Sequence, residues 1–245
     1  MLKIGKINAS MVSKKLIVVT GGSKGIGRAI LEIFMANGFD GVTCARNIEE
    51  LELLKSWFAS RGQHLFIKKA DMGKKEDVVS FGEFVLGLKR NIDVLVNNAG
   101  YFVPGEIVTE PEGTLENMLN TNLLSAYYIT RSLVPQMKTN NQGLVINICS
   151  IASMKAYANG GSYAITKFAL LGFSKCLREE LKPFQIKVSS IMPGATKTAS
   201  WDGVELPDNR FMKIEDVAKV AFTCYDVSDS AVLEDIVLRP LPGDI

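Results

Sequence analysis

The chain alternates between short, continuously apolar runs and longer segments in which apolar residues recur every three or four positions. The first apolar run covers residues 16–19 and is mostly β-branched. Such a run predicts a strand that is buried on both faces, as in a parallel sheet. The segment that follows is apolar at residues 26, 29, 30, 33 and 34 and ends at Asn37-Gly38. This period predicts an amphipathic helix with a glycine stop.

The same alternation continues to the end of the chain. Further strands are predicted at residues 41–44, 64–68, 94–96, 144–149, 186–191 and 236–238. Helices are predicted between them, at residues 48–58, 78–88, 163–181 and 217–224, with a longer, broken helical region at residues 111–138. Repeated strand–helix units give a parallel sheet with right-handed crossovers and helices on both faces.

We therefore predict an α/β protein with a doubly wound Rossmann fold and a seven-stranded parallel sheet. Residues 14–245 would form one domain, and residues 1–13 would be an exposed lead-in. In such a fold, ligands bind at the carboxyl ends of the strands.

Composition agrees with one globular domain. The 245 residues are 47% hydrophobic, which is enough for a sizeable core. The net charge is +2, from 28 basic and 26 acidic residues without a run of like charge. Neither nucleic acid nor a membrane is therefore implied as a partner. No apolar stretch reaches membrane-spanning length and the first residues lack the core of a signal peptide, so we expect a cytoplasmic protein.

Cysteine and histidine suggest no metal chemistry. Cys44, Cys149, Cys176 and Cys224 each lie in an apolar segment without C-x-x-C spacing. We expect four small buried side chains in a reducing compartment. The single histidine, His64, opens a predicted strand, so we expect neither a metal site nor a histidine-based catalytic triad.

Tyr163 and Lys167 stand four residues apart at the start of a predicted helix. This spacing places both side chains on one helix face. A nearby cation favours the ionised form of a phenol, whose ordinary pKa is about 10, and a phenol so placed can exchange a proton with a substrate oxygen. Alone, the pair is better explained as a half-buried tyrosine beside a solvated lysine.

Residues 20–27 join the first strand to the first helix and read Thr-Gly-Gly-Ser-Lys-Gly-Ile-Gly. A flexible glycine turn is one explanation. A strand, a glycine turn and a helix in this order are also the context of dinucleotide binding, in which the backbone approaches a pyrophosphate at the helix N-terminus.

The spacing T-G-x-x-x-G-x-G resembles that of the short-chain dehydrogenase/reductase family, in its compact single-domain branch. The resemblance runs from about Lys15 to about Leu238 and includes further motifs in the family's order. These are N-N-A-G at residues 97–100, an asparagine at 122, a serine at 150 before the Y-x-x-x-K pair, and P-G-x-x-x-T at residues 193–198.

The resemblance implies catalytic roles for Asn122, Ser150, Tyr163 and Lys167. Tyr163 would be the general acid or base, and Ser150 would bond the same substrate oxygen. Lys167 would lower the pKa of Tyr163 and bond the nicotinamide ribose. Asn122 would hold a water in a proton relay, although on its own it is equally a turn residue.

The resemblance also implies a set of cofactor-binding residues. They are Gly21, Ser23, Lys24, Gly25, Ile26, Gly27, Arg46, Asp71, Met72, Asn98, Ala99, Gly100, Tyr163, Lys167, Pro193, Gly194, Thr196 and Thr198.

We expect the cofactor to be NADP(H). Users of NAD(H) place an acidic residue at the end of the second strand. Here Ala45 stands at that position, Arg46 follows it, and Lys24 lies in the glycine turn. Both cations could bind a 2′-phosphate.

The implied function is hydride transfer between nicotinamide and a carbonyl or secondary alcohol of a small molecule. The alternatives are a catalytically silent NADPH-binding sensor or scaffold, and an epimerase or dehydratase. The sequence does not identify the substrate. Residues 195–213 would cover its pocket, with apolar side chains and charges both present: Trp201, Val204, Leu206, Phe211, Lys197, Asp202, Glu205 and Arg210.

The helix at residues 163–181 is apolar around most of its circumference, more than one sheet contact requires. The residues concerned are Phe168, Leu171, Phe173, Cys176 and Leu177. Such a helix is buried on several sides. We therefore expect a homodimer or homotetramer.

Overall fold

The structure is a computed structural model that describes residues 14–198, 201, 203 and 206–244. The lead-in expected at residues 1–13 lies outside the described residues. So do Asp202, Val204 and Glu205 of the segment expected to cover the substrate pocket.

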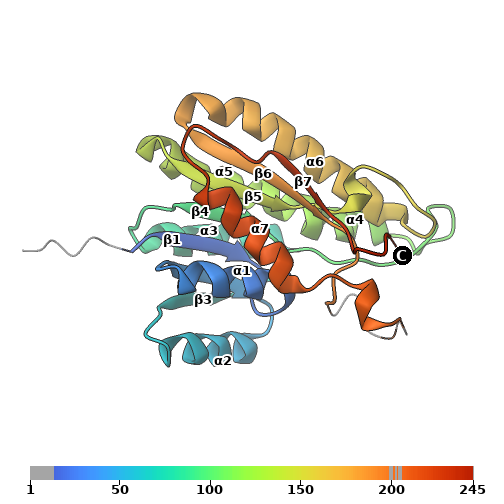
Figure 1. Ribbon diagram of the computed structural model, residues 1–245, viewed down its shortest axis with the longest axis horizontal. Coiled ribbons are helices and arrows are strands. Elements are labelled where there is room, and N and C mark those ends of the chain that lie inside the picture. The colour runs from blue at the N-terminus through green and yellow to red at the C-terminus, as the bar shows by residue number, and fades with distance from the viewer. Residues whose placement is uncertain (1–13, 199–200, 202, 204–205, 245) are drawn as a thin grey trace, which may run out of the picture.

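Seven parallel strands form one sheet in the order β3-β2-β1-β4-β5-β6-β7 (Figure 1). The chain runs outward from β1 to β3, returns to β4 beside β1, and then runs outward again to β7. Their bounds are β1 Leu16–Thr20, β2 Asp40–Ala45, β3 Leu65–Lys69, β4 Val94–Asn97, β5 Gly143–Ile148, β6 Ile186–Pro193 and β7 Asp235–Leu238. This confirms the predicted doubly wound fold and places the reversal of strand order between β1 and β4.

Helices cover both faces of the sheet. The helices on one face are α1 Gly25–Ala36, α2 Ile48–Ala59 and α7 Ile214–Asp226. Those on the other are α3 Lys75–Gly87, α5 Ser125–Asn140 and α6 Gly161–Leu181. A shorter helix, α4 Thr114–Leu119, precedes α5. Within the described chain, no helix is long and apolar enough to cross a membrane.

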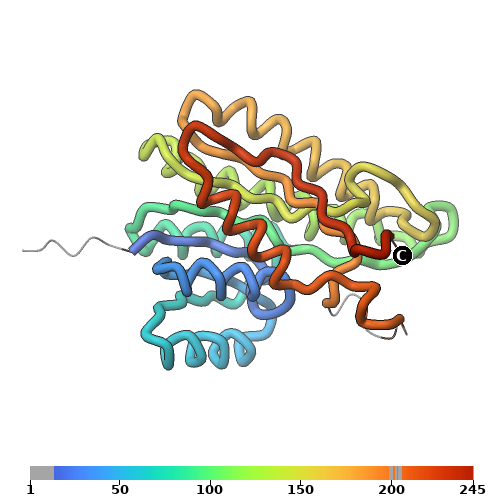
Figure 2. Tube along the Cα trace, in the orientation of Figure 1, coloured from blue at the N-terminus to red at the C-terminus, as the bar shows by residue number. Residues whose placement is uncertain are grey.

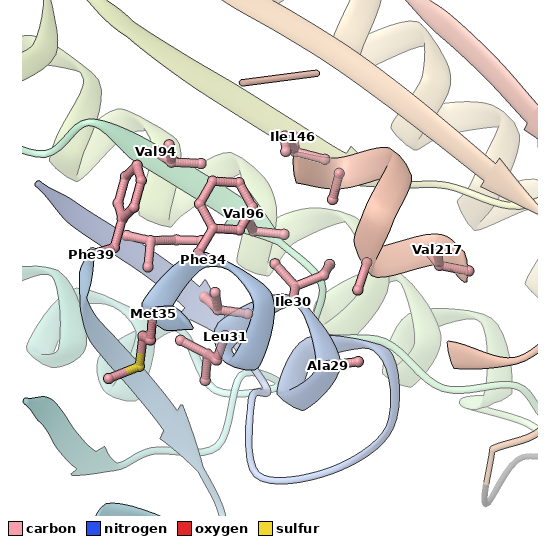
Figure 3. Close-up of a cluster of buried hydrophobic side chains, with 14 of the residues drawn as sticks. Ala29, Ile30, Leu31, Phe34, Met35, Phe39, Val94, Val96, Ile146 and Val217 are labelled. Atoms are coloured by element: carbon pink, nitrogen blue, oxygen red, sulfur yellow. The ribbon is translucent and has the colours of Figure 1, made fainter. Parts of the chain in front are cut away.

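The two largest apolar clusters of the core lie on opposite faces of the sheet because side chains alternate along each strand. In β1, Ile17 and Val19 belong to the cluster under α1 and α7, whereas Leu16 and Val18 belong to the cluster under α3, α5 and α6. Phe34 of α1 is completely buried in the first cluster (Figure 3). This packing holds α1, and so the turn before it, in a fixed position on the sheet.

A series of hydrogen bonds between buried polar side chains connects β4 and β5 with α5 and α6, on the face of the sheet that α3, α5 and α6 cover. The Asn97 amide at the end of β4 donates to Asn147 Oδ1 of β5 at 2.8 Å and to Thr130 Oγ1 of α5 at 3.1 Å. The Asn147 amide donates in turn to Ser174 Oγ of α6 at 2.8 Å. Since buried amides need such partners, these bonds fix the position of α5 and α6 along the strands.

Two expectations need correction. The helical region at residues 111–138 is not broken, because a π-helical turn at Asn120–Leu124 joins α4 to α5. A π turn accommodates an extra residue without ending the helix. Of the four cysteines, only three are buried, because Cys176 lies on an exposed part of α6.

Candidate active site

The strands β1, β2, β4, β5 and β6 all end at one cavity of about 940 Å³. Its walls include Gly21, Arg46, Asn98, Ser150 and Gly194, which follow these five strands in turn. Figure 2 shows that the loops after the strands gather at one end of the sheet, where the C-terminal residues also lie. The cavity therefore occupies the position at which doubly wound sheets bind ligands, and it is large enough for a cofactor.

The glycine turn brings bare backbone to the cavity. Gly21 and Gly25 have φ values of +69° and +59°, which glycine adopts without strain. A Cβ at Gly27 would stand 2.6 Å from the Gly21 carbonyl oxygen and closer still to the Asn98 amide. Helix α1 begins after Lys24 without a side-chain cap or an acidic residue in its first turn. Its free N–H groups can therefore bind an anion such as a pyrophosphate.

The N-N-A-G segment is tied to the same turn. The Asn98 amide donates to the carbonyl oxygens of Thr20 and Gly21 at 2.9 and 3.0 Å. In return, Thr20 Oγ1 accepts hydrogen bonds from the backbone N–H groups of Asn98 and Ala99 at 3.1 and 3.0 Å. These four bonds hold the ends of β1 and β4 together beneath the cavity.

Ser150, Tyr163 and Lys167 line one wall of the cavity. Ser150 is the second residue after β5, and Tyr163 lies in the first turn of α6. Lys167 lies one turn further along α6, where its Nζ donates to the Ile148 carbonyl at 2.9 Å. It stands 5.7 Å from the centre of the Tyr163 ring. The structure thus brings together three of the four residues that the sequence singled out for catalysis.

Burial shifts the pKa values of two side chains in this wall, Tyr163 and Lys167. It raises the pKa of the Tyr163 phenol, and the hydrogen bond with Ser150 opposes that shift. Burial also lowers the pKa of the Lys167 ammonium to about 8. Desolvation of the phenolate thus dominates the pKa of Tyr163, and the expected effect of Lys167 on that pKa stays a prediction. At neutral pH the phenol is protonated and can donate a proton.

Asn122 lies in the π-helical turn and does not line the cavity. Its Oδ1 accepts from the Tyr101 backbone N–H at 2.9 Å, and its amide donates to the Tyr101 carbonyl at 3.0 Å and to Thr166 Oγ1 at 3.1 Å. A Cβ at Gly100 would stand 3.2 Å from Asn122 Oδ1 and 3.6 Å from Lys167 Nζ. Asn122 thus braces the segment after N-N-A-G beside Lys167.

Of the residues predicted to bind a cofactor, only Gly27 lies outside the cavity wall. Lys24 and Arg46 are exposed at one end of the cavity, and within the described part of the chain neither forms an ion pair. Glu50 lies beside them and accepts a hydrogen bond from Ser23 at 3.1 Å. Asp71 supplies a second carboxylate to the cavity wall, so the two cations stand with two acidic residues in this lining.

The sequence analysis missed several wall residues, chiefly Tyr101, Phe102, Lys155, Tyr157, Arg239 and Asp244. Trp201, which belongs to the segment expected to cover the substrate pocket, lines the cavity and contacts Phe211 edge to face, with ring centroids 5.1 Å apart. No periodicity identifies such residues, since each lies in a loop between elements.

Glu110 is a further missed residue, and it sits at the start of the Tyr163 helix. The Ser162 hydroxyl donates to Glu110 Oε1, and Glu110 Oε2 is buried without a hydrogen-bond partner among the described residues. A Cβ at Gly161, where φ is +26°, would overlap the Gly105 carbonyl oxygen. Helix α6 has no side-chain N-cap of its own, so this carboxylate supplies the negative charge that favours a helix N-terminus.

We expect Glu110→Ala and Ser162→Ala each to lower turnover by about tenfold, because the start of α6 positions the Tyr163 hydroxyl. Cofactor affinity, measured by fluorescence titration, should change by less than about twofold, since neither residue lines the cavity. The double variant should be no worse than either single one, as expected for two groups that act through one contact. Glu106→Ala on the same exposed segment is the control, and additive losses would contradict this role.

Comparison with known proteins gives consistent matches. The family model described as short chain dehydrogenase matches residues 15–208. A sepiapterin reductase of Chlorobaculum tepidum is 30% identical over 95% of this chain and 98% of its own length. A diacetyl reductase of Staphylococcus epidermidis is 29% identical over 84% of this chain and 79% of its own length.

Solved structures agree. An alcohol dehydrogenase from Thermococcus sibiricus, complexed with 5-hydroxy-NADP, superposes with a TM-score of 0.86 at 25% identity and covers 93% of this chain and 97% of its own. A metagenomic short-chain oxidoreductase in complex with NADP gives a TM-score of 0.80 at 28% identity, over 92% of this chain and 96% of its own.

Proposed function

The chain belongs to the short chain dehydrogenase family, and on that basis we propose that it is an NADP(H)-dependent oxidoreductase acting on a carbonyl or secondary alcohol of a small molecule. One observation carries the proposal. Ser150, Tyr163 and Lys167 share a single cavity with the uncapped N-terminus of α1. Proton transfer and dinucleotide binding can therefore take place side by side.

The residues present fit such a cofactor. The glycine turn and the N-terminus of α1 would hold the pyrophosphate. Lys24 and Arg46 would hold a 2′-phosphate, Asp71 would meet the adenine, and Lys167 would bond the nicotinamide ribose. The nicotinamide, when bound, donates or accepts the hydride. NADP and 5-hydroxy-NADP in the two solved relatives support this assignment.

The protein's own part in reduction is proton transfer and charge stabilisation. Tyr163 donates its phenolic proton to the carbonyl oxygen as negative charge develops there, and Ser150 donates a hydrogen bond to the same oxygen. Lys167 and Asn122 would restore the proton through a relay. In the oxidation direction Tyr163 must first be ionised. Because its pKa is raised, oxidation should become faster as the pH increases.

A silent sensor or scaffold, and an epimerase or dehydratase, remain the alternative functions. The presence of Ser150, Tyr163 and Lys167 in one cavity favours catalysis over a silent protein. The names of the relatives favour reduction, since the matched proteins include a sepiapterin reductase and a diacetyl reductase. Sepiapterin and diacetyl are therefore the first substrates to test, with NADPH oxidation followed by absorbance.

Replacing Tyr163 by phenylalanine tests the catalytic role. The substitution removes only the hydroxyl, so NADPH should still bind while turnover falls by about a hundredfold or more. Lys167→Met should instead reduce both turnover and cofactor affinity. A folded Tyr163→Phe protein that keeps nearly wild-type kcat would refute the assignment.

The preference for NADP(H) can be tested by titrating both cofactors by fluorescence. We expect NADPH to bind about thirtyfold more tightly than NADH at moderate salt, since charged hydrogen bonds contribute about 1.5–3 kcal/mol and exposure reduces this. Ala45→Asp with Arg46→Leu should reverse the preference, and Lys24→Ala should only weaken it. Equal or tighter NADH binding by the wild type would contradict the prediction.

We also propose that the protein is a homodimer or homotetramer. On α6, Phe168 is 46% exposed and Ile165 is 40% exposed, while Leu177 of the same helix is buried against the sheet. Together with the exposed Cys176, they leave apolar surface that a second subunit would cover. Light scattering should show an oligomer at micromolar concentration, and Phe168→Glu should weaken it. A wild-type monomer would refute the proposal.

A further inference from the structure

Three aromatic residues, Phe102, Tyr157 and Trp201, line the cavity that also holds Ser150 and Tyr163, and they come from three different segments of the chain. Aromatic rings prefer one another in edge-to-face or offset arrangements, by more than their apolar area alone explains. The positions of these rings therefore affect which substrates the cavity binds.

Phe102 is fixed against the catalytic residue itself. Its ring meets the Tyr163 ring edge to face, with centroids 4.9 Å apart and an interplanar angle of 72°. The segment that carries it is held at the start of α6, where the Gly105 N–H donates to the Asn159 carbonyl at 3.1 Å and Glu110 accepts from Ser162. The Phe102 ring is therefore held in a fixed position beside Tyr163.

Tyr157 is held on the other side of the helix start. A Cβ at Gly160 would stand 3.3 Å from Cε2 of the Tyr157 ring, so the ring rests directly on bare backbone. Partial burial raises the pKa of this phenol to about 12, although 44% of the residue's surface stays exposed. Among the described residues that hydroxyl has no hydrogen-bond partner.

Trp201 provides the third ring, from the segment after β6. It is supported by Phe211, edge to face at 66°, so that ring has a preferred orientation. Its indole N–H has no hydrogen-bond partner in the part of the chain that the structure describes. Tyr157 and Trp201 thus each provide an aromatic ring and a hydrogen-bond donor that has no partner among the described residues.

Building on the proposed function, we propose that the substrate carries a flat aromatic ring, or a heteroaromatic ring, close to the reacting carbonyl. The carbonyl oxygen would lie between Ser150 and Tyr163. The ring would pack among Phe102, Tyr157 and Trp201, where the Tyr157 hydroxyl and the Trp201 N–H can reach nitrogen or oxygen atoms on its rim. A saturated ring of the same size gains only area burial from this wall.

The test compares 1-phenylpropan-2-one with 1-cyclohexylpropan-2-one, two ketones of similar size whose carbonyls are not conjugated with the ring. We expect kcat/KM for the phenyl ketone to be higher by about tenfold, the scale of one good aromatic contact. Trp201→Leu should reduce that ratio to below about threefold. Trp57→Leu is the matched control, because Trp57 lies on α2 away from the cavity and its loss should leave the ratio unchanged.

A binding measurement complements the rates. The chain has two tryptophans, so Trp57→Phe leaves Trp201 as the sole indole emitter. With NADPH bound, 1-phenylpropan-2-ol should alter its fluorescence at concentrations at which the cyclohexyl alcohol has little effect. Equal responses to the two alcohols would overturn the inference.

The outcomes separate this inference from the proposed function. Reduction of both ketones with equal kcat/KM, or a preference for the cyclohexyl compound, would overturn the aromatic substrate class and leave the oxidoreductase intact. Failure to reduce these ketones, sepiapterin and diacetyl in a preparation that binds NADPH would overturn both.

Discussion

The hydrogen bonds between Thr20 and the Asn98-Ala99 pair determine where the rest of the site lies. They join the ends of β1 and β4, the two strands between which the order of the sheet reverses. The glycine turn rises from one of these ends and the N-N-A-G segment from the other, so one contact sets the distance between them. Gly27 can approach Asn98 only because it has no side chain. A methyl group there would separate the two loops and widen the crevice in which a dinucleotide would lie.

A second set of contacts relates the catalytic helix to that crevice. The polar chain from Asn97 through Asn147 to Ser174 fixes α6 along the sheet, and Asn122 fixes the backbone of Tyr101 beside Lys167. Both sets use buried amides, whose geometry is demanding because an unpaired amide in the core is costly. The apolar clusters hold the layers together, whereas these polar contacts set their register.

Much of this arrangement could be predicted from sequence, because the signals are local. Buried parallel strands are continuous apolar runs, and residues that follow such runs meet at one edge of the sheet, which is how Ser150 and the glycine turn could be placed together. What could not be predicted depends on packing between distant segments. The raised pKa of Tyr163 reflects the burial of its ring, and the Glu110–Ser162 hydrogen bond spans 52 residues. The exposure of Cys176 likewise depends on which side of α6 the sheet covers.

The segment from residue 101 to residue 113 meets the start of α6 at the Phe102 ring, at the backbone of Gly105 and at the carboxylate of Glu110. Between the last two anchors, Ile107 and Val108 are 63% and 89% exposed. Side chains at these two positions can vary without moving the anchors or the proton donor that they support. Neither Ile107 nor Val108 lines the cavity. The surface of this segment can therefore change independently of the site, provided that Gly105 and Glu110 are kept.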